Sequence, residues 1–299
     1  MQSNNPLVSI IVITYNSSKY VLETLESAKV QTYQNIELIV SDDCSTDNTV
    51  EICSDWLIEN KERFVRTELI TVEKNTGIAP NCNRGFKAAR GEWVKSIAGD
   101  DILNPECIST FLHYIKKHPG FSFLFSDMEI FGNDKVSYKK NYARIWTDRS
   151  LRSYESITTA ENQLKKLMIS NNVSSASAIY KRETFNLIGG FDEEIKLLED
   201  WPFWINASKK GYLIISIKEK LIRYRLNESS VQTSARYKIA YELFLQKYIF
   251  KNFLFRLTFN HINQLKVGNK EKYLFLFLKI TAFPQRIIWK TRRKFATSD

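Results

Sequence analysis

The sequence is poor in the residues that hold small secreted or metal-stabilised domains together. It has only four cysteines in 299 residues (Cys44, Cys53, Cys82 and Cys107), and no two of them form a CxxC pair. This argues against a zinc ribbon and against a disulfide-bonded secreted domain, so a reducing compartment is expected. The apolar run near the N-terminus stops at Thr14 with no basic residue before it, which is typical of a buried strand and not of a signal peptide. No apolar stretch reaches the roughly 18 residues of a membrane-spanning helix, so no such helix is expected.

Several signatures of catalysis and phosphate binding are also missing. The three histidines (His113, His118 and His261) do not have the spacing of a metal site or of a nucleophile with its base. Neither a GxxxxGK[ST] loop nor a GxGxxG loop is present. If the protein binds phosphates, a metal ion and cationic side chains must hold them.

The net charge of +10 is concentrated at one end of the chain. Residues 231–299 contain 14 Lys and Arg against 3 Asp and Glu, together with 14 of the 39 aromatic residues, whereas residues 1–230 are nearly neutral. A basic aromatic tail on a neutral body favours attachment to an anionic membrane surface over a nucleic-acid enzyme. The alternative is packing on the core or on a second copy of the chain. We expect packing on the core or on a second copy of the chain for 237–259, and a lipid anchor for 273–295.

The first hundred residues alternate between strand and helix patterns. Strands are predicted at 8–14, 36–41, 68–72 and 92–97, with helices at 20–30, from Ser45 and Thr46 onward, and at 79–90. Later elements are a helix to about 118, a strand at 121–131, a helix at 161–170, a segment at 174–180, a helix at 181–188, strands around 213–226 and a helical tail from about 234. Strands that are apolar on both faces and separated by helices predict an α/β fold with a mostly parallel sheet covered on both sides.

Pairs of acidic residues follow two of the predicted strands. Asp42 and Asp43 end the second strand, and Asp100 and Asp101 follow the fourth. Open parallel sheets bind ligands beyond the carboxyl ends of their strands. Helix capping explains the Ser and Thr residues after Asp43 but not two adjacent carboxylates, which require a ligand, a donor network or a cation. One of the first pair can accept the imide N–H of uracil or thymine, and the second pair suits Mg²⁺ or Mn²⁺.

A third acidic pair, Glu199 and Asp200, stands among leucines and tryptophans in LLEDWPFW. One interpretation is a helix N-terminus whose acids complement the helix dipole, with Pro202 in the first turn. The other is a carboxylate base whose pKa is raised by its apolar surroundings. The segment alone favours neither.

Five ordered motifs within residues 6–230 resemble the inverting GT-A glycosyltransferases of family 2. They are VSIIVITYN, IELIVSDDCSTDNT, NTGIAPNCNRGFKAARGEW, the GDD loop and GGFDEEIKLLEDWPFW. The resemblance implies a Rossmann-like GT-A fold and a nucleotide-sugar donor, expected to be a UDP-sugar. It divides the chain into a nucleotide-sugar-binding half (1–125), an acceptor-binding half with the catalytic base (126–230) and a basic aromatic helical tail (231–299).

The resemblance also implies roles for particular residues. It makes Asp200 the catalytic base and places Mn²⁺ or Mg²⁺ on Asp101 and Asp100. It places Glu199, Trp201 and Arg225 either behind the residues that touch the substrates or on the acceptor side. The implied nucleotide-binding residues are Thr14, Tyr15, Asn16, Asp42, Asp43, Asn83 and Asp100. The sequence departs from the family pattern at Ala98, where the first acid of the metal loop is missing, and at Asn227, where a histidine is expected.

The expected reaction is a single displacement that inverts the anomeric centre, with Asp200 accepting the proton of the acceptor hydroxyl. The expected acceptor is a glycan, specifically a lipid-linked precursor of a bacterial surface polysaccharide such as O-antigen or capsule. The protein is then expected in the cytoplasm on the inner face of the membrane, as a monomer or homo-oligomer, without nucleic acid as a partner. The alternatives are a sugar nucleotidyltransferase, or a non-catalytic basic scaffold that binds membranes or nucleic acid. The first normally has a Gly-rich basic loop where TYNSSKY stands, and the second requires a basic body.

Overall fold

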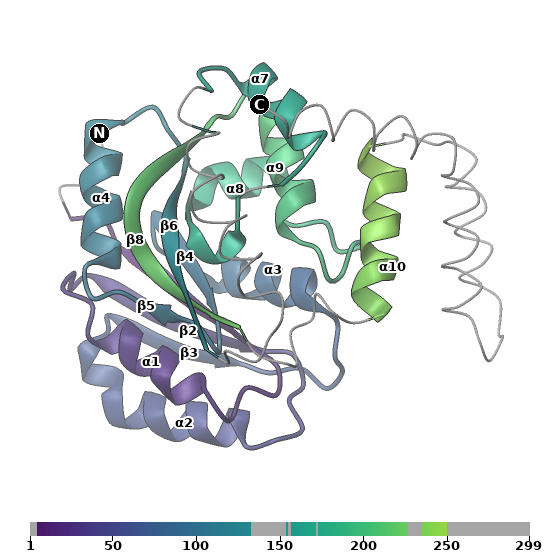
Figure 1. The fold of residues 1–299 in the computed structure, drawn as a ribbon. Helices are drawn as coiled ribbons and strands as arrows, with labels where there is room; N and C mark the ends of the chain where they lie inside the picture. The colour runs from purple at the N-terminus through teal and green to yellow at the C-terminus, as the bar shows by residue number, and fades with distance from the viewer. Residues whose placement is uncertain (1–4, 133–153, 155–156, 172, 227–234, 250–299) are drawn as a thin grey trace, which may run out of the picture.

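A computed structural model describes residues 5–132, 154, 157–171, 173–226 and 235–249. Within these residues, eight strands form one sheet in the order β3-β2-β1-β4-β7-β6-β8-β5 (Figure 1). The strands are β1 (Val8–Thr14), β2 (Ile36–Asp42), β3 (Arg66–Ile70), β4 (Trp93–Ala98), β5 (Ile102–Leu103), β6 (Phe123–Gly132), β7 (Ala178–Lys181) and β8 (Ile214–Leu226). The pairs β3–β2, β2–β1, β1–β4 and β6–β8 are parallel, whereas β7 is antiparallel to both of its neighbours and β5 is antiparallel to β8.

Helices cover both faces of the sheet (Figure 1). One face carries α1 (Val21–Lys29), α2 (Thr49–Asn60) and α4 (Cys107–Lys117), and the other carries α3 (Ile78–Ala88), α7 (Ala160–Leu167), α8 (Arg182–Ile188), α9 (Asp200–Lys209) and α10 (Ala235–Phe244). Short helical turns are η1 (Lys61–Arg63), η2 (Ser175–Ser177) and η4 (Leu245–Ile249). The predicted α/β architecture with a mostly parallel sheet is confirmed.

The two faces arise from the alternation of side chains along the strands. In β1, Ile10 and Val12 belong to the apolar cluster under α1, α2 and α4, while Ile11 belongs to the cluster under α3, α8 and α9. All three side chains are fully buried. A strand apolar at every position therefore contributes to two cores at once, which requires a layer of helices on each side.

Some predicted boundaries are wrong for local reasons. Helix α2 begins at Thr49 and not at Ser45, because the Ser45 backbone N–H and hydroxyl both donate to Asp42 and hold this stretch as a loop. The segment 174–180 divides into η2 and β7, and 213–226 is one long strand, β8. The short strand β5 was not predicted. The domain boundary expected near residue 125 falls within β6. Strands that precede this residue and strands that follow it belong to the same sheet. The division into a nucleotide-sugar-binding half and an acceptor-binding half stays a prediction.

The start of the basic tail packs on the body, as expected for its first segment. On α10, Phe244 lies 4.4 Å from the Trp201 ring of α9, measured between ring centroids. In η4, Lys247 forms ion pairs of 2.6 Å with Asp192 and Glu194. The proposed lipid-anchor segment, 273–295, lies outside the described residues. No helix in the described ranges is long and apolar enough to cross a membrane.

Candidate active site

The acidic and polar residues that follow β1, β2 and β4 meet at one edge of the sheet. Strand β1 pairs with β2 on one side and with β4 on the other, so the three carboxyl ends are neighbours. Gly99 allows the loop after β4 to approach the loop after β1, because a Cβ at this position would lie 2.9 Å from the Thr14 Cγ2 atom. Thr14, Asp42 and the Asp100–Asp101 loop are therefore brought together as predicted from the strand pattern.

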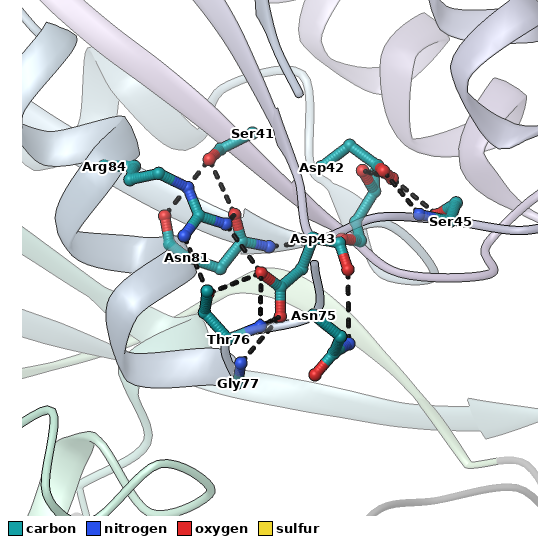
Figure 2. Close-up of polar contacts among 10 residues, drawn as sticks. Ser41, Asp42, Asp43, Ser45, Asn75, Thr76, Gly77, Asn81 and Arg84 are labelled. Carbon is teal, nitrogen blue, oxygen red and sulfur yellow. Dashed lines mark hydrogen bonds and ion pairs between the residues drawn. The ribbon is translucent and has the colours of Figure 1, made fainter. Parts of the chain in front are cut away.

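Asp42 organises the loop that follows β2. Its side chain is fully buried and accepts a hydrogen bond from the Thr14 hydroxyl at 2.7 Å. It also accepts the Ser45 N–H at 2.7 Å and the Ser45 hydroxyl at 2.5 Å (Figure 2). These bonds join the ends of β1 and β2. Both Asp42 oxygens are thus engaged by donors of the chain itself.

The turn after β1 is joined to the same loop. Asn16 has a left-handed backbone with φ of 50°; its N–H donates to the Ser45 hydroxyl at 2.8 Å, and its side-chain oxygen accepts the Thr46 N–H at 2.8 Å. Beside it, the Tyr15 side chain is half exposed. The geometry therefore leaves an accessible aromatic ring at the strand end while the Asn16 side chain is used within the protein.

Asp43 is the centre of a second network, formed with the start of α3 (Figure 2). Its carboxylate accepts the Thr76 hydroxyl at 2.6 Å, the Gly77 N–H at 2.7 Å and an Arg84 Nη2–H at 2.7 Å. Burial by itself would raise the pKa of Asp43, but the hydrogen bonds from Thr76, Arg84 and Gly77 outweigh it and lower the pKa. Asp43 is therefore a fixed anion at neutral pH.

Asn83 connects α3 to the loop that precedes α9. Its side-chain oxygen accepts the Phe191 N–H and its amide group donates to the Phe191 carbonyl, each at 2.9 Å, with a further bond of 2.8 Å to Glu193. The structure thus places Asn83 away from the Asp42 and Asp43 networks. Its role in nucleotide binding stays a prediction.

The loop after β4 contains a carboxylate in an unusual setting. Asp101 is 1% exposed; its Oδ1 accepts the Arg225 N–H at 2.8 Å, and its Oδ2 has no hydrogen-bond partner in the part of the chain that the structure describes. Burial and the neighbouring charge of Asp100 raise the pKa of Asp101 well above its ordinary value. An unpartnered, buried carboxylate oxygen is costly unless a proton or a cation binds it.

Arg225 fixes this loop from strand β8. Its Nε–H donates to the Asp100 carbonyl at 2.7 Å, and its guanidinium pairs with Glu23 at 2.7 Å while lying 4.2 Å from the centre of the Tyr20 ring. These contacts place Arg225 beside the Asp100–Asp101 loop. A position on the acceptor side stays a prediction.

The residues Glu199 and Asp200 begin helix α9, which fits both interpretations of the sequence. Asp200 is the first residue of the helix, where an acid complements the helix dipole, and its Oδ1 accepts the N–H of Trp201 at 2.6 Å. Burial raises the pKa of Asp200 to about 6, although hydrogen bonds from Trp201, Ser175 and Asn171 oppose the rise. Burial and the charge of Asp200 raise the pKa of Glu199 to about 8. Burial therefore raises the pKa of both carboxyl groups, and the two titrate as a pair.

Trp201, the next residue, packs against neighbouring elements of the protein. Its indole N–H donates to the Leu167 carbonyl at 2.7 Å, and its ring is buried against α10. It supports the helix that carries Asp200. Contact with an acceptor stays a prediction.

Helix α3 brings the Asp43 network and the Glu199–Asp200 pair to the same region. The Ala79 N–H donates to the Lys196 carbonyl at 3.1 Å, so the chain that leads to Glu199 packs on the start of α3. Burial raises the pKa of the Cys82 thiol, and the charges of Glu199 and Asp43 raise it further. Both carboxylates are therefore within electrostatic reach of one buried sulfur.

The Asp100–Asp101 loop fits a divalent cation only in part. Among the described side chains, no group of three or more His, Cys, Asp and Glu has the arrangement of a metal site. Mg²⁺ is nevertheless commonly bound by one or two carboxylates together with substrate phosphates. The unpartnered Oδ2 atom of Asp101 is the observation that fits a cation at this loop.

A cavity of about 600 Å³ lies at the opposite edge of the sheet, at the amino end of β4. It is lined by Arg90, Glu92, Lys181, Arg182, Glu183, Asn186 and Leu187. None of the predicted site residues lines it, so it is separate from the candidate active site.

Sequence reasoning missed several residues of the site. Arg84 and Thr76 hold Asp43 and lie within the motif NTGIAPNCNRGFKAARGEW, but no role was predicted for them. Ser175 and Asn171 act on Asp200 from segments with no local motif. Lys95 was missed as well, although a lysine in the otherwise buried strand pattern EWVKSI was a visible signal. Its side chain is fully buried, and burial lowers its pKa to about 8.

The fold and site define an α/β protein that has acidic residues at the carboxyl edge of its sheet and a buried pair of carboxyl groups at a helix N-terminus. The chain matches the sequence model of the family described as Glycosyl transferase family 2 over residues 9–188. It is 31% identical over 237 residues to an uncharacterized glycosyltransferase of Haemophilus influenzae, which covers 78% of this chain and 69% of the relative. The chain therefore belongs to glycosyltransferase family 2, whose members transfer sugars from nucleotide sugars.

Other similarities extend the comparison. The chain is 28% identical over 206 residues to a chondroitin synthase of Escherichia coli, covering 69% of this chain and 27% of that longer protein. A crystal structure of S. aureus TarS 1-349 in complex with UDP-GlcNAc has a TM-score of 0.60 at 23% identity, covering 92% of this chain and 73% of TarS 1-349. The mannosyltransferase PcManGT of Pyrobaculum calidifontis, in complex with GDP-Man and Mn²⁺, has a TM-score of 0.58 at 18% identity, covering 99% of this chain and 76% of PcManGT. These two structures show the fold, and the predicted GT-A fold is confirmed.

Proposed function

We propose that this protein transfers one sugar from a UDP-sugar to a hydroxyl group of a glycan, with inversion of the anomeric centre, and that Asp200 is the catalytic base. The observation that carries the proposal is the Glu199–Asp200 pair at the start of α9. Burial raises the pKa of Asp200 to about 6, which is close to the value that suits a base at neutral pH. Burial and the charge of Asp200 also raise the pKa of its neighbour Glu199.

The reaction needs no covalent intermediate. The acceptor oxygen forms a bond to the anomeric carbon as the bond to the nucleoside diphosphate breaks, and the acceptor proton passes to an Asp200 carboxylate oxygen. Positive charge builds on the sugar ring in this transition state. The buried carboxylate at the start of α9 stabilises that charge as well as accepting the proton.

Asp100 and Asp101 are the residues that would hold Mn²⁺ or Mg²⁺. When bound, the cation neutralises the charge that develops on the departing diphosphate. The Asp101 oxygen without a hydrogen-bond partner supports this assignment, and so does the Mn²⁺ in the structure of PcManGT. Arg225 holds the loop in place through the Asp101 carboxylate and the Asp100 carbonyl.

The nucleotide is proposed to bind along the loops after β1 and β2. The half-exposed Tyr15 ring provides a surface on which a base can stack, and Asp43 holds a fixed negative charge nearby. UDP as the nucleotide is supported by the complex of TarS with UDP-GlcNAc. Roles in nucleotide binding for Thr14, Asn16, Asp42 and Asn83 remain part of this proposal.

A glycan acceptor is supported by the similarity to a chondroitin synthase, and we propose a lipid-linked precursor of a bacterial surface polysaccharide. The basic tail would hold the enzyme on the anionic inner face of the cell membrane, in the cytoplasm. Family membership argues against the alternatives of a sugar nucleotidyltransferase and a non-catalytic scaffold.

A panel of nucleotide sugars tests the proposal. The protein is incubated with Mn²⁺ and, in turn, UDP-GlcNAc, UDP-glucose, UDP-galactose and GDP-mannose, and the release of nucleoside diphosphate is measured with water as the acceptor. We expect release from at least one UDP-sugar, and loss of that release in Asp200→Asn. Release from none of the donors, or full activity in a folded Asp200→Asn protein, would contradict it.

A further inference from the structure

Lys95 occupies a position where the fold should favour an apolar residue. It lies in the middle of β4, in register with Ile10 of β1 and Ile179 of β7, and its side chain is fully buried. Removing an ammonium group from water in this way costs free energy unless its hydrogen bonds are replaced. The contacts of its Nζ atom therefore indicate what the lysine does.

The Lys95 ammonium group extends toward the carboxyl edge of the sheet from the face that α1 and α4 cover. Side chains alternate along β4, and Trp93 and Ile97 belong to the apolar cluster under α1 and α4, so Lys95 points to this face. From there Nζ donates to the Ala176 carbonyl at 2.7 Å and to the Ser96 carbonyl at 2.5 Å. The first bond joins β4 to the turn η2.

The turn η2 in turn contacts the proposed base. Just before the turn, the Trp204 indole N–H of α9 donates to the Val173 carbonyl at 3.1 Å, which joins this segment to the helix that begins at Asp200. The Ser175 backbone and the Asn171 side chain oppose the rise in the pKa of Asp200, which is consistent with their lying near its carboxylate. The position of the Asp200 oxygens therefore depends on how η2 is held.

The structure assigns Lys95 a positioning role for the catalytic base: its ammonium group fixes η2 to β4, and η2 orients the Asp200 carboxylate. The assignment rests on the proposed function of Asp200.

This role predicts an effect on turnover and not on donor binding. A displacement of about 1 Å at a reacting group is enough to reduce the rate on the order of 10²-fold. Without the Lys95 ammonium group, η2 loses its bond to β4, while the Asp42 and Asp43 networks do not contact η2 and remain intact. We therefore expect Lys95→Met to lower kcat by about 10- to 100-fold with a UDP dissociation constant within about twofold of wild type.

A double-mutant cycle with Asp200→Asn separates positioning from a general structural effect. The release of UDP from the UDP-sugars of the panel is measured, with water as the acceptor, for wild type, Lys95→Met, Asp200→Asn and the double variant. If Lys95 acts through Asp200, Lys95→Met lowers kcat in the wild-type background and causes no further loss in the Asp200→Asn background. Equal factors in both backgrounds, or loss of UDP binding in calorimetry, would overturn the assignment.

A second variant guards against a folding defect. Lys95→Gln keeps an N–H donor without a charge, and we expect a kcat between those of wild type and Lys95→Met. If neither variant folds, as judged by circular dichroism and thermal unfolding, Lys95 is a structural residue and the assignment is wrong. Failure of the proposed function has a different signature, because then wild type releases no UDP or Asp200→Asn is fully active.

Discussion

The sharpest expectation concerns the pH dependence of catalysis by Asp200. Because burial raises its pKa to about 6, the carboxylate is about 90% ionised at pH 7 and about 10% ionised at pH 5. Only the ionised form accepts a proton, so kcat/KM should fall about tenfold as the pH drops from 7 to 5. An Asp with an ordinary pKa near 4 would lose only about a tenth of its activity over the same range.

The perturbation that tests this is Asp200→Asn, paired with Glu199→Gln. The first removes the base, and we expect kcat/KM at pH 7 to fall by on the order of 10²-fold or more. The decrease of kcat/KM from pH 7 to pH 5, the acid limb of the profile, should then be abolished. The second replaces the neighbouring carboxyl group with a neutral amide of the same size and leaves Asp200 in place. The acid limb of Glu199→Gln should therefore stay near pH 6.

The assay is the release of nucleoside diphosphate across pH 5 to 9 at sub-saturating donor, since kcat/KM reports the groups of the free enzyme. The reasoning is refuted if a folded Asp200→Asn protein retains the acid limb of wild type. It is also refuted if Glu199→Gln abolishes the limb, which would make Glu199 the titrating base. Binding of UDP by calorimetry serves as the control for both variants.

Three further predictions concern other parts of the molecule. Arg84→Met removes a partner of the buried Asp43 carboxylate, so we expect the free energy of unfolding in urea to fall by about 1–3 kcal/mol; a change below about 0.5 kcal/mol would contradict the ion pair. Calorimetry should show that Mn²⁺ tightens UDP binding to wild type but not to Asp101→Asn, and equal affinity for wild type with and without EDTA would reject the metal site. Truncation before Tyr273 should weaken binding to anionic liposomes at low salt and leave UDP binding intact, because each Lys or Arg near such a surface contributes about 1 kcal/mol; a truncated chain that binds these liposomes as well as wild type excludes the lipid anchor.

The periodicity of the sequence was sufficient to predict the layered fold. The continuous apolar run from Val8 to Ile13 can satisfy both faces of a strand only in a sheet covered on both sides. The alternation of such runs with helices made the sheet parallel, and this placed the residues after each strand at one edge. Asp42, Asp43, Asp100 and Asp101 could be singled out for that reason alone.

Local boundaries were less predictable because they depend on hydrogen bonds to distant residues. Ser45 and Thr46 have the composition of a helix start, but Ser45 donates to Asp42 and Thr46 to Asn16, which delays α2 until Thr49. Similarly, the segment 174–180, to which no element type was assigned, divides into the turn η2 and the strand β7. Propensity is overridden wherever such bonds form.

The sequence by itself determined the kinds of chemical group available: three pairs of carboxylates, no histidine or cysteine centre, and a basic end. Only the tertiary structure decided what surrounds them. Asp43 became a fixed anion because Arg84 and Thr76 fold against it, and Asp200 acquired a raised pKa because α9 buries it beside η2. Burial and hydrogen bonding depend on residues far apart in the chain, so no local pattern encodes them. For the same reason Lys95 is visible in the sequence as an oddity, while its bond to Ala176, 81 positions away, exists only in the folded protein.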